Sequence, residues 1–470
     1  MTTQAIQPSV YPQLTAEFKQ RRTLNWLAVG LLYAFFYTTR YNWTVVSPKI
    51  ADVLGWQNAQ LGVFELWMPI VYAFSVIFNG PIADRIGGKK AFLFGAVGVV
   101  IMNVLFGLAS TAVVTPAVWE GVKDAKHLVT PAVLKPGIQP GGLLTFMAVV
   151  WGLNGFFQAF GALSIVKINA HWFHVRERGT FSGVFGVLIR LGLLLAFSGV
   201  PLILLKFSWP YAFWIPAAFV ALFFLINLGF VHNSPEEAKL GEFETGDASD
   251  DGQGPASLGF VVSKIFASRA TWTIALCSMM IGFVRRSHLD AWWPRYFQQY
   301  HGADPSHFAT FTPYVLATWG IALSGIAGGF AFGISSDRRF GGRRAPVIAF
   351  GFLGMAAALA LSGVGDHLHM GPMVASIWLV VLSFCVNGAH GMIGGAASMD
   401  FGGKKATATA AGLFDGMQYM TAFLVGPGVP WLTKKWGWEA WHWAPVPFAL
   451  IGALLMTTLW NVTPSRKAGH

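Results

Sequence analysis

The sequence places arginines inside apolar stretches, and this combination points to the binding of an anion. Arg40 lies in the run LLYAFFYTTRYNW, and residues 24–37 just before it carry no charge. Arg285 and Arg286 lie in a second such stretch, IGFVRRSHLDAWWPRYF (281–297). Two permanently charged guanidinium groups cannot neutralise each other, so we expect an anion between them. A doubly charged phosphate, with several acceptor oxygens, suits two planar guanidinium groups better than a carboxylate does.

The composition indicates the setting of these arginines. Of the 470 residues, 54% are hydrophobic and only 11% are charged, whereas an average soluble chain has about 25% charged residues. Apolar runs of about 20 residues, the length of a helical membrane span, recur along the whole chain. The runs are continuous rather than alternating, which speaks against a membrane β-barrel. The sequence therefore predicts an all-α membrane protein, and its 54 glycines suit close packing of membrane helices.

The apolar runs predict twelve transmembrane helices in two groups of six, separated by the polar stretch Ser234–Ser257. This stretch is acidic and rich in glycine and serine, which is typical of a flexible linker. We expect a cytoplasmic N-terminus (1–23), an N-terminal bundle (24–232), a cytoplasmic linker (233–262), a C-terminal bundle (263–463) and a cytoplasmic tail (464–470). The expected spans are 24–47, 60–83, 91–112, 142–166, 180–203, 209–231, 263–286, 308–334, 346–363, 372–397, 407–430 and 444–462.

Basic residues gather in alternate loops, and the positive-inside rule then places both chain ends in the cytoplasm, on the inner face of the plasma membrane. The first 22 residues are polar and contain no signal-peptide core. Because the net charge of +11 resides largely in these loops, it indicates topology and not a nucleic-acid partner. The lipid bilayer is the expected surrounding, and we expect the protein to function as a monomer.

A loop motif recurs in both halves. GPIADRIGGKK (80–90) follows the second span and GISSDRRFGGRR (333–344) follows the eighth. The same motif at the same place in each half is typical of a duplicated transporter bundle. Charged side chains here can pair with helix ends when this side of the protein closes; the alternative role is plain anchoring of the loops. The candidate gating residues are Asp84, Arg85, Asp337 and Arg338.

These loops resemble the signature loop of the major facilitator superfamily, and the resemblance covers nearly the whole chain. Further motifs resemble the organophosphate:inorganic phosphate antiporters, the glycerol-3-phosphate and hexose-phosphate transporters. In that family, paired arginines of the first and seventh helices bind the phosphate, which implies Arg40 and Arg286 here. The motifs are YAFSVIFNGPIAD with Tyr72, GFFQAFG with Gln158, HWFHVRERG, Arg286 eight residues before Pro294, and DFGGKKATATAAG.

The surroundings of Arg40 agree with a binding role. An arginine inside the membrane costs at least about 2.5–3.5 kcal/mol and usually faces a cavity, although Arg40 could instead extend to the outer interface. Tyr33 and Tyr37 precede it at the spacing i, i+4, i+7, so the three side chains share one helix face. Two phenol groups would then lie beside the guanidinium. For these tyrosines and for Tyr72, simple packing remains the alternative.

The chain departs from the family pattern in two places. The resemblance implies a histidine in the fifth helix, but this chain has Ile189 there with Arg190 next to it. A lysine expected in the second span is replaced by Val76. Arg190 lies too deep in its span to reach water easily. It therefore either joins the anion site, which implies a more anionic substrate, or pairs with an acid such as Asp415.

Other polar residues inside spans have open roles. Asp415 is either a proton-coupling carboxylate or a charge partner, and His390 either lines the cavity or packs with a hydrogen bond. Asp290 follows Arg286 by four residues and is expected to orient it. We expect no metal site, because the histidines and acids do not cluster. No catalytic constellation and no phosphate-binding G-x-x-x-x-G-K-[ST] loop occur in the sequence, so neither an enzyme nor a cofactor is expected.

The sequence favours a secondary transporter that exchanges a small phosphorylated solute for inorganic phosphate. Glycerol phosphate, a sugar phosphate and phosphoglycerate are candidate solutes. A proton-coupled organic-anion symporter using Arg40 with Asp415 or Glu65 is one alternative. A membrane sensor of external sugar phosphate is another, because such a protein would keep the same arginines.

Overall fold

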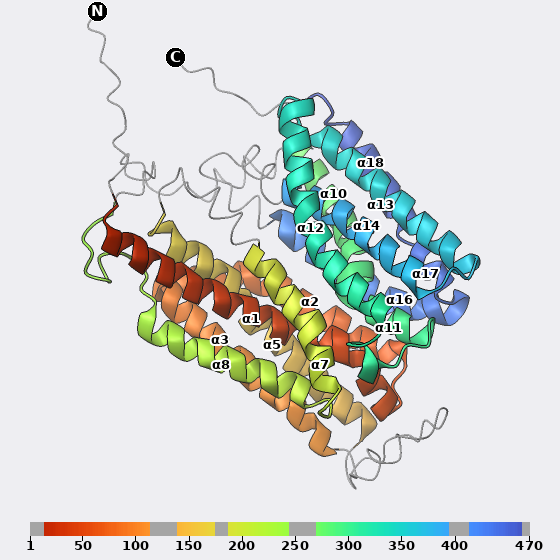
Figure 1. Ribbon diagram of the computed structural model, residues 1–470, viewed down its shortest axis with the longest axis horizontal. Helices are drawn as coiled ribbons and strands as arrows, with labels where there is room; N and C mark the ends of the chain where they lie inside the picture. The colour runs from red at the N-terminus through yellow and green to blue at the C-terminus, as the bar shows by residue number, and fades with distance from the viewer. Residues whose placement is uncertain (1–13, 113–138, 174–186, 244–268, 394–412, 463–470) are drawn as a thin grey trace, which may run out of the picture.

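The computed structural model describes residues 14–112, 139–173, 187–243, 269–393 and 413–462, and within these the chain is almost wholly helical (Figure 1). The N-terminal half contains α1 (Ala16–Leu54), α2 (Asn58–Ile86), α3 (Gly88–Leu108), η1 (Ala109–Ala112), α5 (Pro140–Ala170), residues 187–194 running into η4 (Leu195–Gly199) and α7 (Val200–Leu204), and α8 (Tyr211–Phe230).

The C-terminal half repeats this series. It contains α10 (Arg269–Arg285), η6 (Arg286–Ala291), α11 (Trp293–Gln299), η7 (Pro305–His307), α12 (Thr312–Arg339), α13 (Arg344–His367), α14 (Pro372–Gly391), a helix over 413–420 followed by α16 (Ala422–Trp436), α17 (Glu439–Trp443) and α18 (Val446–Thr457).

Helix packing follows the same pattern in both halves. The close pair α2–α5 corresponds to α12–α14, and α3–α8 corresponds to α13–α18. Glycine permits the close contacts of α2 with α5 and of α12 with α14. A Cβ atom at Gly155 would lie 2.6 Å from the carbonyl oxygen of Met68, and a Cβ atom at Gly328 would lie 2.2 Å from the carbonyl oxygen of Phe384. Such backbone approach at small residues is how membrane helices pack. The repeat seen in the loops therefore extends to the bundles.

Nine helices in the described residues are long and apolar enough to cross a membrane. The remaining three expected spans are interrupted or more polar. Tyrosines, threonines and Arg40 lower the hydropathy of α1, the π-helix η6 follows α10, and a turn at Thr421 divides 413–436. Together they account for the twelve expected spans. These three spans carry several polar residues of the site described below, among them Arg40, Arg286 and Tyr419.

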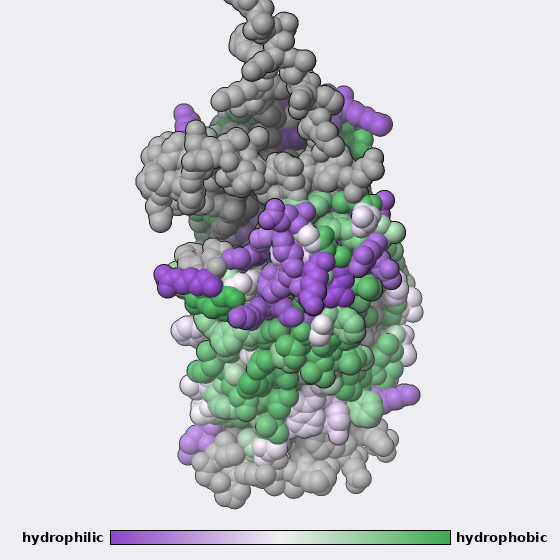
Figure 2. All heavy atoms as spheres, turned by 90° about the vertical axis from the view of Figure 1, so that its left-hand side faces the viewer, coloured by the Kyte–Doolittle hydropathy of each residue, from purple (hydrophilic) through white to green (hydrophobic). Residues whose placement is uncertain are grey.

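The outer surface of the bundles is apolar, as a lipid-facing surface must be. Figure 2 shows a band of hydrophobic side chains on the N-terminal half, with hydrophilic residues above it. Large exposed apolar residues in both halves include Phe78, Leu225, Phe330 and Leu454. The protein is thus a multi-pass membrane protein, in agreement with its composition.

The first part of the expected linker, residues 233–243, is packed against the bundle and is not the flexible segment that its composition predicts. Residues 233–243 pack on the N-terminal half, where the ring centroid of Phe243 lies 4.8 Å from that of Phe18. Asn233 accepts a hydrogen bond from the backbone N–H of Lys89 at 2.8 Å. A hydrogen bond from Ser234 lowers the pKa of Glu236. The apolar Phe243 within this polar stretch explains the packing; residues 244–268 lie outside the described part.

The two halves meet at one end of the molecule. They converge where α1 ends beside α11 and where α2 meets α16, and they diverge toward the opposite end, where α1 begins and α18 ends (Figure 1). We call the converging end the far end. There Asn58 donates to Gln299 at 3.0 Å and to Thr433 at 3.2 Å, and it accepts from Arg295 at 3.0 Å. These hydrogen bonds join α2 to both α11 and α16.

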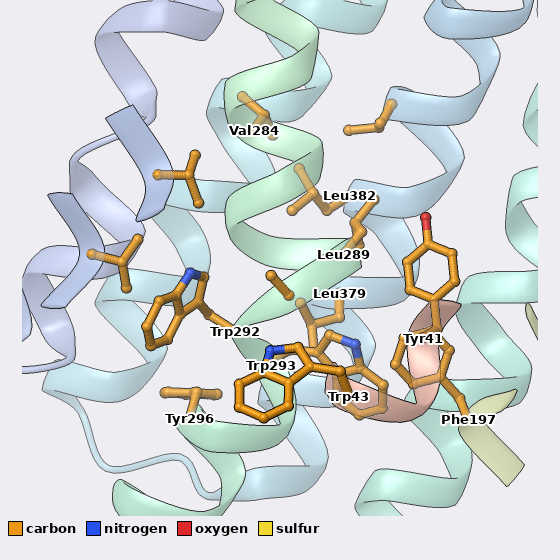
Figure 3. Close-up of a cluster of buried hydrophobic side chains, with 14 of the residues drawn as sticks. Tyr41, Trp43, Phe197, Val284, Leu289, Trp292, Trp293, Tyr296, Leu379 and Leu382 are labelled. Carbon is orange, nitrogen blue, oxygen red and sulfur yellow. The ribbon is translucent and has the colours of Figure 1, made fainter. Parts of the chain in front are cut away.

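Glycines and aromatic rings complete this contact. A Cβ atom at Gly62 would lie 2.2 Å from the carbonyl oxygen of Gly426, so α2 and α16 cross in backbone contact. Phe197 of η4 packs on Trp293 of α11 with ring centroids 5.2 Å apart, inside the aromatic cluster of Figure 3. The far end is therefore closed.

Candidate anion-binding site

A small cavity lies between the halves on the inner side of the far-end contact. Its volume is about 20 Å³, which is room for a water molecule and too little for a phosphorylated solute. The structure thus represents a contracted state of the site. Polar and aromatic side chains from both halves line it: Arg40, Glu65 and Tyr72 from one half, and Arg286, Asp290 and Tyr419 from the other.

Arg40 is held by neutral groups. Its Nη2 and Nε atoms donate to Oε1 of Gln158 at 3.2 and 3.4 Å. The guanidinium carbon lies 4.6 Å from the ring centroid of Tyr72 and 5.1 Å from that of Tyr37. Arg40 is 7% exposed and makes no ion pair within the part of the chain that the structure describes. A buried cation held only by an amide and aromatic rings is suited to receive an anion.

The amide of Gln158 has a fixed orientation. Its Nε2 donates to the carbonyl oxygen of Phe36 and to Oγ1 of Thr39, both at 3.1 Å, so Oε1 must face Arg40. Tyr33 is buried behind this group and contacts Tyr37 edge to face at 5.3 Å between centroids. The stripe of Tyr33, Tyr37 and Arg40 is therefore present, with Tyr37 next to the guanidinium.

Arg286 has a carboxylate partner from the other half. Its Nη2 donates to Oε2 of Glu65 at 3.3 Å, and Oε1 of Glu65 accepts from Nε1 of Trp43 at 3.1 Å. The guanidinium also lies 5.7 Å from the ring centroid of Tyr419. From the sequence, Glu65 is expected only as an alternative coupling group. A lone acid within an otherwise apolar span was the signal for a partner of one of the arginines.

Asp290 pairs with Arg285, in contrast to the expectation that it orients Arg286. Its Oδ2 accepts from Nε of Arg285 at 3.0 Å. The reason is local geometry: residues Arg286–Ala291 form a π-helix, whose i→i+5 repeat brings residues five apart onto one face. Orientation of Arg286 by Asp290 would require the i, i+4 spacing of a regular α-helix. Arg285 also donates to Oε1 of Gln418 at 3.1 Å.

Arg190 forms no ion pair with Asp415 or with Asp290. It donates to Oδ1 of Asn387, across the interface between the halves, at 2.5 Å. Asp415 forms no ion pair with any described residue, and interacts electrostatically with Arg285 and Arg40 at longer range. Of the two alternatives for Arg190, pairing with Asp415 is therefore not formed in this state.

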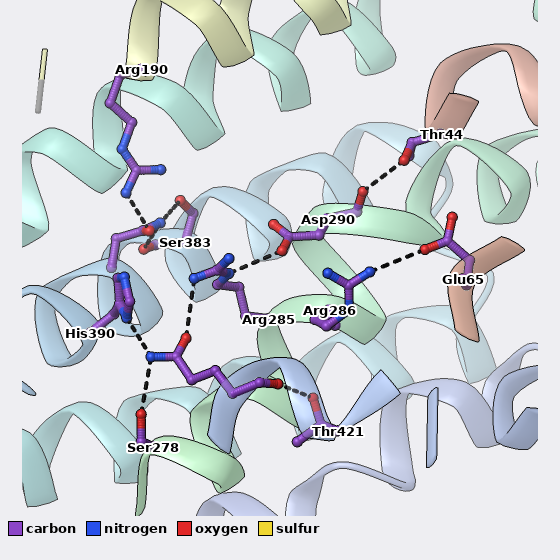
Figure 4. A network of polar contacts seen from close by, with 12 residues as sticks. Thr44, Glu65, Arg190, Ser278, Arg285, Arg286, Asp290, Ser383, His390 and Thr421 are labelled. Carbon is purple, nitrogen blue, oxygen red and sulfur yellow. Dashed lines mark hydrogen bonds and ion pairs between the residues drawn. The ribbon is translucent and has the colours of Figure 1, made fainter. Parts of the chain in front are cut away.

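His390 belongs to a hydrogen-bonded chain that Figure 4 displays. Oε1 of Gln418 accepts from Arg285, so its Nε2 must be the donor to Nδ1 of His390 at 2.7 Å and to the hydroxyl of Ser278 at 3.1 Å. The ring then accepts at Nδ1, and a neutral His390 carries its proton on Nε2. His390 thus faces the same network as Arg285.

The three candidate gating residues whose side chains the structure describes lie away from this network. Asp337 forms an ion pair with Arg344 of its own loop at 2.7 Å, and its side chain is 66% exposed. Arg85 and Arg338 are exposed in the last turns of α2 and α12. The side chain of Asp84 lies outside the described part. Arg85, Asp337 and Arg338 do not line the cavity, which is the arrangement expected for residues that bind no substrate.

The site as a whole carries more positive than negative side chains. Four arginines face three carboxylates between the halves, and only two of the arginines have a carboxylate partner. The groups are Arg40, Arg190, Arg285 and Arg286 against Glu65, Asp290 and Asp415. Among the described residues, no group of three or more His, Cys, Asp or Glu side chains could hold a metal ion. An excess of buried guanidinium groups over carboxylates is suited to an anion.

Two bundles of transmembrane helices around a central polar site define the class of multi-pass membrane transport proteins. Residues 29–427 match the family model described as Major Facilitator Superfamily. The chain belongs to this family, and it is not an enzyme. The solved structure of a D-xylose-proton symporter has the same fold, with a TM-score of 0.68 over 96% of this chain and 99% of that one at 16% identity.

Curated relatives span the whole chain at low identity. A "Probable hexose phosphate transport protein" of Chlamydia trachomatis is 23% identical over 97% of this chain and 94% of its own length. The "Glycerol-3-phosphate transporter" of Bacillus subtilis is 23% identical over 97% of this chain and 96% of its own. The "Membrane sensor protein UhpC" of Escherichia coli is 22% identical with the same coverage of 97% and 96%.

Proposed function

We propose that the protein exchanges a small phosphorylated organic solute for inorganic phosphate across the plasma membrane, with both chain ends in the cytoplasm and as a monomer. The observation that carries the proposal is Arg40, a buried guanidinium that Gln158, Tyr37 and Tyr72 orient but that forms no ion pair with a described carboxylate. A phosphate has both the charge and the acceptor oxygens that this group needs. The names of the curated relatives agree with this substrate class.

The charges of the site also account for exchange in place of net uptake. Without an anion, closing the halves brings Arg40, Arg190 and the two arginines of the seventh span together against too few carboxylates. A bound anion removes that repulsion, so the loaded protein changes conformation faster than the empty one. The far end is the outer end in the predicted topology. The contact across Gly62 and Gly426 would open as the opposite end closes.

The proposal is tested by reconstitution of the purified protein in liposomes loaded with inorganic phosphate. External radioactive phosphate should enter by exchange, and glycerol-3-phosphate or glucose-6-phosphate should compete with it. Arg40→Gln should remove exchange, whereas Arg269→Gln, the same change at an exposed position, should leave it intact. Normal exchange in Arg40→Gln liposomes would refute the assignment of Arg40.

A second candidate function follows from Asp415. Its carboxylate lies near Arg40 and Arg285 without an ion pair in the described residues, and such a group could carry a proton with an organic anion. Uptake driven by a pH gradient into phosphate-free liposomes, and lost in Asp415→Asn, would favour symport. Binding of sugar phosphate without transport under either condition would favour a sensor.

A further inference from the structure

Arg190 and its neighbours form a second cationic centre that the binding of one phosphate does not explain. Arg190 donates to Oδ1 of Asn387, and its side chain interacts electrostatically with Arg285. His390 interacts electrostatically with both arginines. Figure 4 shows these groups on one side of the network, and the Arg286–Glu65 pair on the other. Arg285 forms an ion pair with Asp290 and interacts at longer range with Asp415, whereas Arg190, from the opposite half, forms no ion pair with a described carboxylate.

The fold makes room for Arg190 at this position. A Cβ atom at Gly325 of α12 would lie 3.2 Å from Cζ of Arg190 and 3.0 Å from Nδ2 of Asn387. Asn387 is itself held by Ser383, since its Nδ2 donates to the hydroxyl and the carbonyl oxygen of Ser383, both at 2.9 Å. The amide oxygen is therefore directed at the guanidinium. A neutral amide orients the arginine and leaves its charge uncompensated.

The second centre adjoins the first. The helix over 187–194 packs on α1 so closely that a Cβ atom at Gly192 would lie 2.9 Å from Cβ of Tyr37. Tyr37 contacts the guanidinium of Arg40 and also interacts electrostatically with Arg190. Tyr37 therefore links the two arginines on one wall of the site. A short solute bound at Arg40 by one end would extend toward Arg190 with the other.

We propose that the physiological organic solute is a phosphorylated carboxylic acid, whose phosphate binds at Arg40 and whose carboxylate binds at Arg190. The Nε2–H of His390 supplies a further donor to the carboxylate. One arginine fork with one or two neutral donors matches the two oxygens of a carboxylate. This inference rests on the proposed function, because it assigns the second end of the solute whose phosphate end defines that function.

The test compares 3-phosphoglycerate with glycerol-3-phosphate, which differ in a carboxylate against a hydroxymethyl group. Each is used to inhibit phosphate exchange in liposomes, and the ratio of their half-inhibitory concentrations is the readout. We expect 3-phosphoglycerate to inhibit at a concentration at least about tenfold lower, equivalent to about 1.4 kcal/mol. Arg190→Gln should reduce this preference to about threefold or less. Arg269→Gln should keep it.

Asn387→Asp gives an independent variant in case Arg190→Gln does not fold. Its carboxylate would pair with Arg190 inside the protein and should reduce the same preference. Wild-type exchange without a preference for 3-phosphoglycerate, or a preference that survives in both variants, overturns this inference and leaves the proposed function standing. Absence of phosphate exchange in the wild type overturns both.

Discussion

Arg40 and Arg286 lie in the first helix of each half, yet their surroundings differ. Arg40 is held by an amide and two aromatic rings, whereas Arg286 forms an ion pair with Glu65 of the opposite half. The repeated bundles thus place two guanidinium groups at matching positions with opposite electrostatic environments. We infer that Arg40 keeps its charge available to the solute in this state. Arg286 instead helps to hold the far end closed.

The largest expected effect on the exchange rate is that of replacing Arg40 by lysine, compared with the same change at Arg286. Arg40→Lys should lower exchange at least about hundredfold, because an ammonium group lacks the fork that contacts both Gln158 and an anion. Arg286→Lys should lower it less, about tenfold, because lysine can still pair with Glu65. Exchange rates and phosphate affinity of both variants check this. Equal losses at the two positions would remove the distinction between them.

The next effect concerns the far-end contact itself. Gly62→Ala places a methyl group 2.2 Å from the carbonyl oxygen of Gly426, and a backbone atom cannot move aside. We expect exchange to fall about tenfold while phosphate still protects the protein against heating. Gly428→Ala, on the same helix as Gly426 but with open space around it, is the matched control. A normal rate in Gly62→Ala would show that closure does not need this contact.

Removal of the Glu65 carboxylate should give Arg286 the unpaired charge that distinguishes Arg40. Glu65→Gln leaves Arg286 without a counter-charge, which should lower the melting temperature in the absence of ligand. Phosphate should then raise the melting temperature more than in the wild type, because its binding affinity increases several-fold. Thermal unfolding at a series of phosphate concentrations measures both. A phosphate-induced shift equal to that of the wild type would contradict the assignment.

The smallest effect is expected in the repeated loops. Asp337→Asn breaks the exposed ion pair with Arg344, and exposed pairs contribute only about 0–1 kcal/mol. The exchange rate should fall about two- to fivefold, with phosphate affinity changed less than about threefold. Rate and affinity are compared by liposome exchange and by equilibrium binding. Loss of binding in a folded variant would assign Asp337 to recognition in place of motion.

The sequence predicted the class of protein, and it singled out Arg40, Tyr72 and Arg286, which the structure places around one cavity. Low charge and recurring apolar runs are properties of composition, and they require membrane helices whatever the packing. The spacing of Tyr33, Tyr37 and Arg40 requires only a regular helix, so their common face was predictable. The repeated loops likewise predicted two related bundles, which the helix packing confirms. The gating roles of Asp84 and Asp337, and solute binding by Arg40 and Arg286, stay predictions.

Only the tertiary structure decided which charged groups meet. Asp290 pairs with Arg285 and not with Arg286, because the π-helical turn changes which residues share a helix face. Arg286 forms an ion pair with Glu65, and Arg190 donates a hydrogen bond to Asn387. Both contacts cross the interface between halves that are far apart in the sequence. Such pairs depend on how two rigid bundles dock. Local spacing determines the face of a helix, but the partner of a buried charge is set by the whole fold.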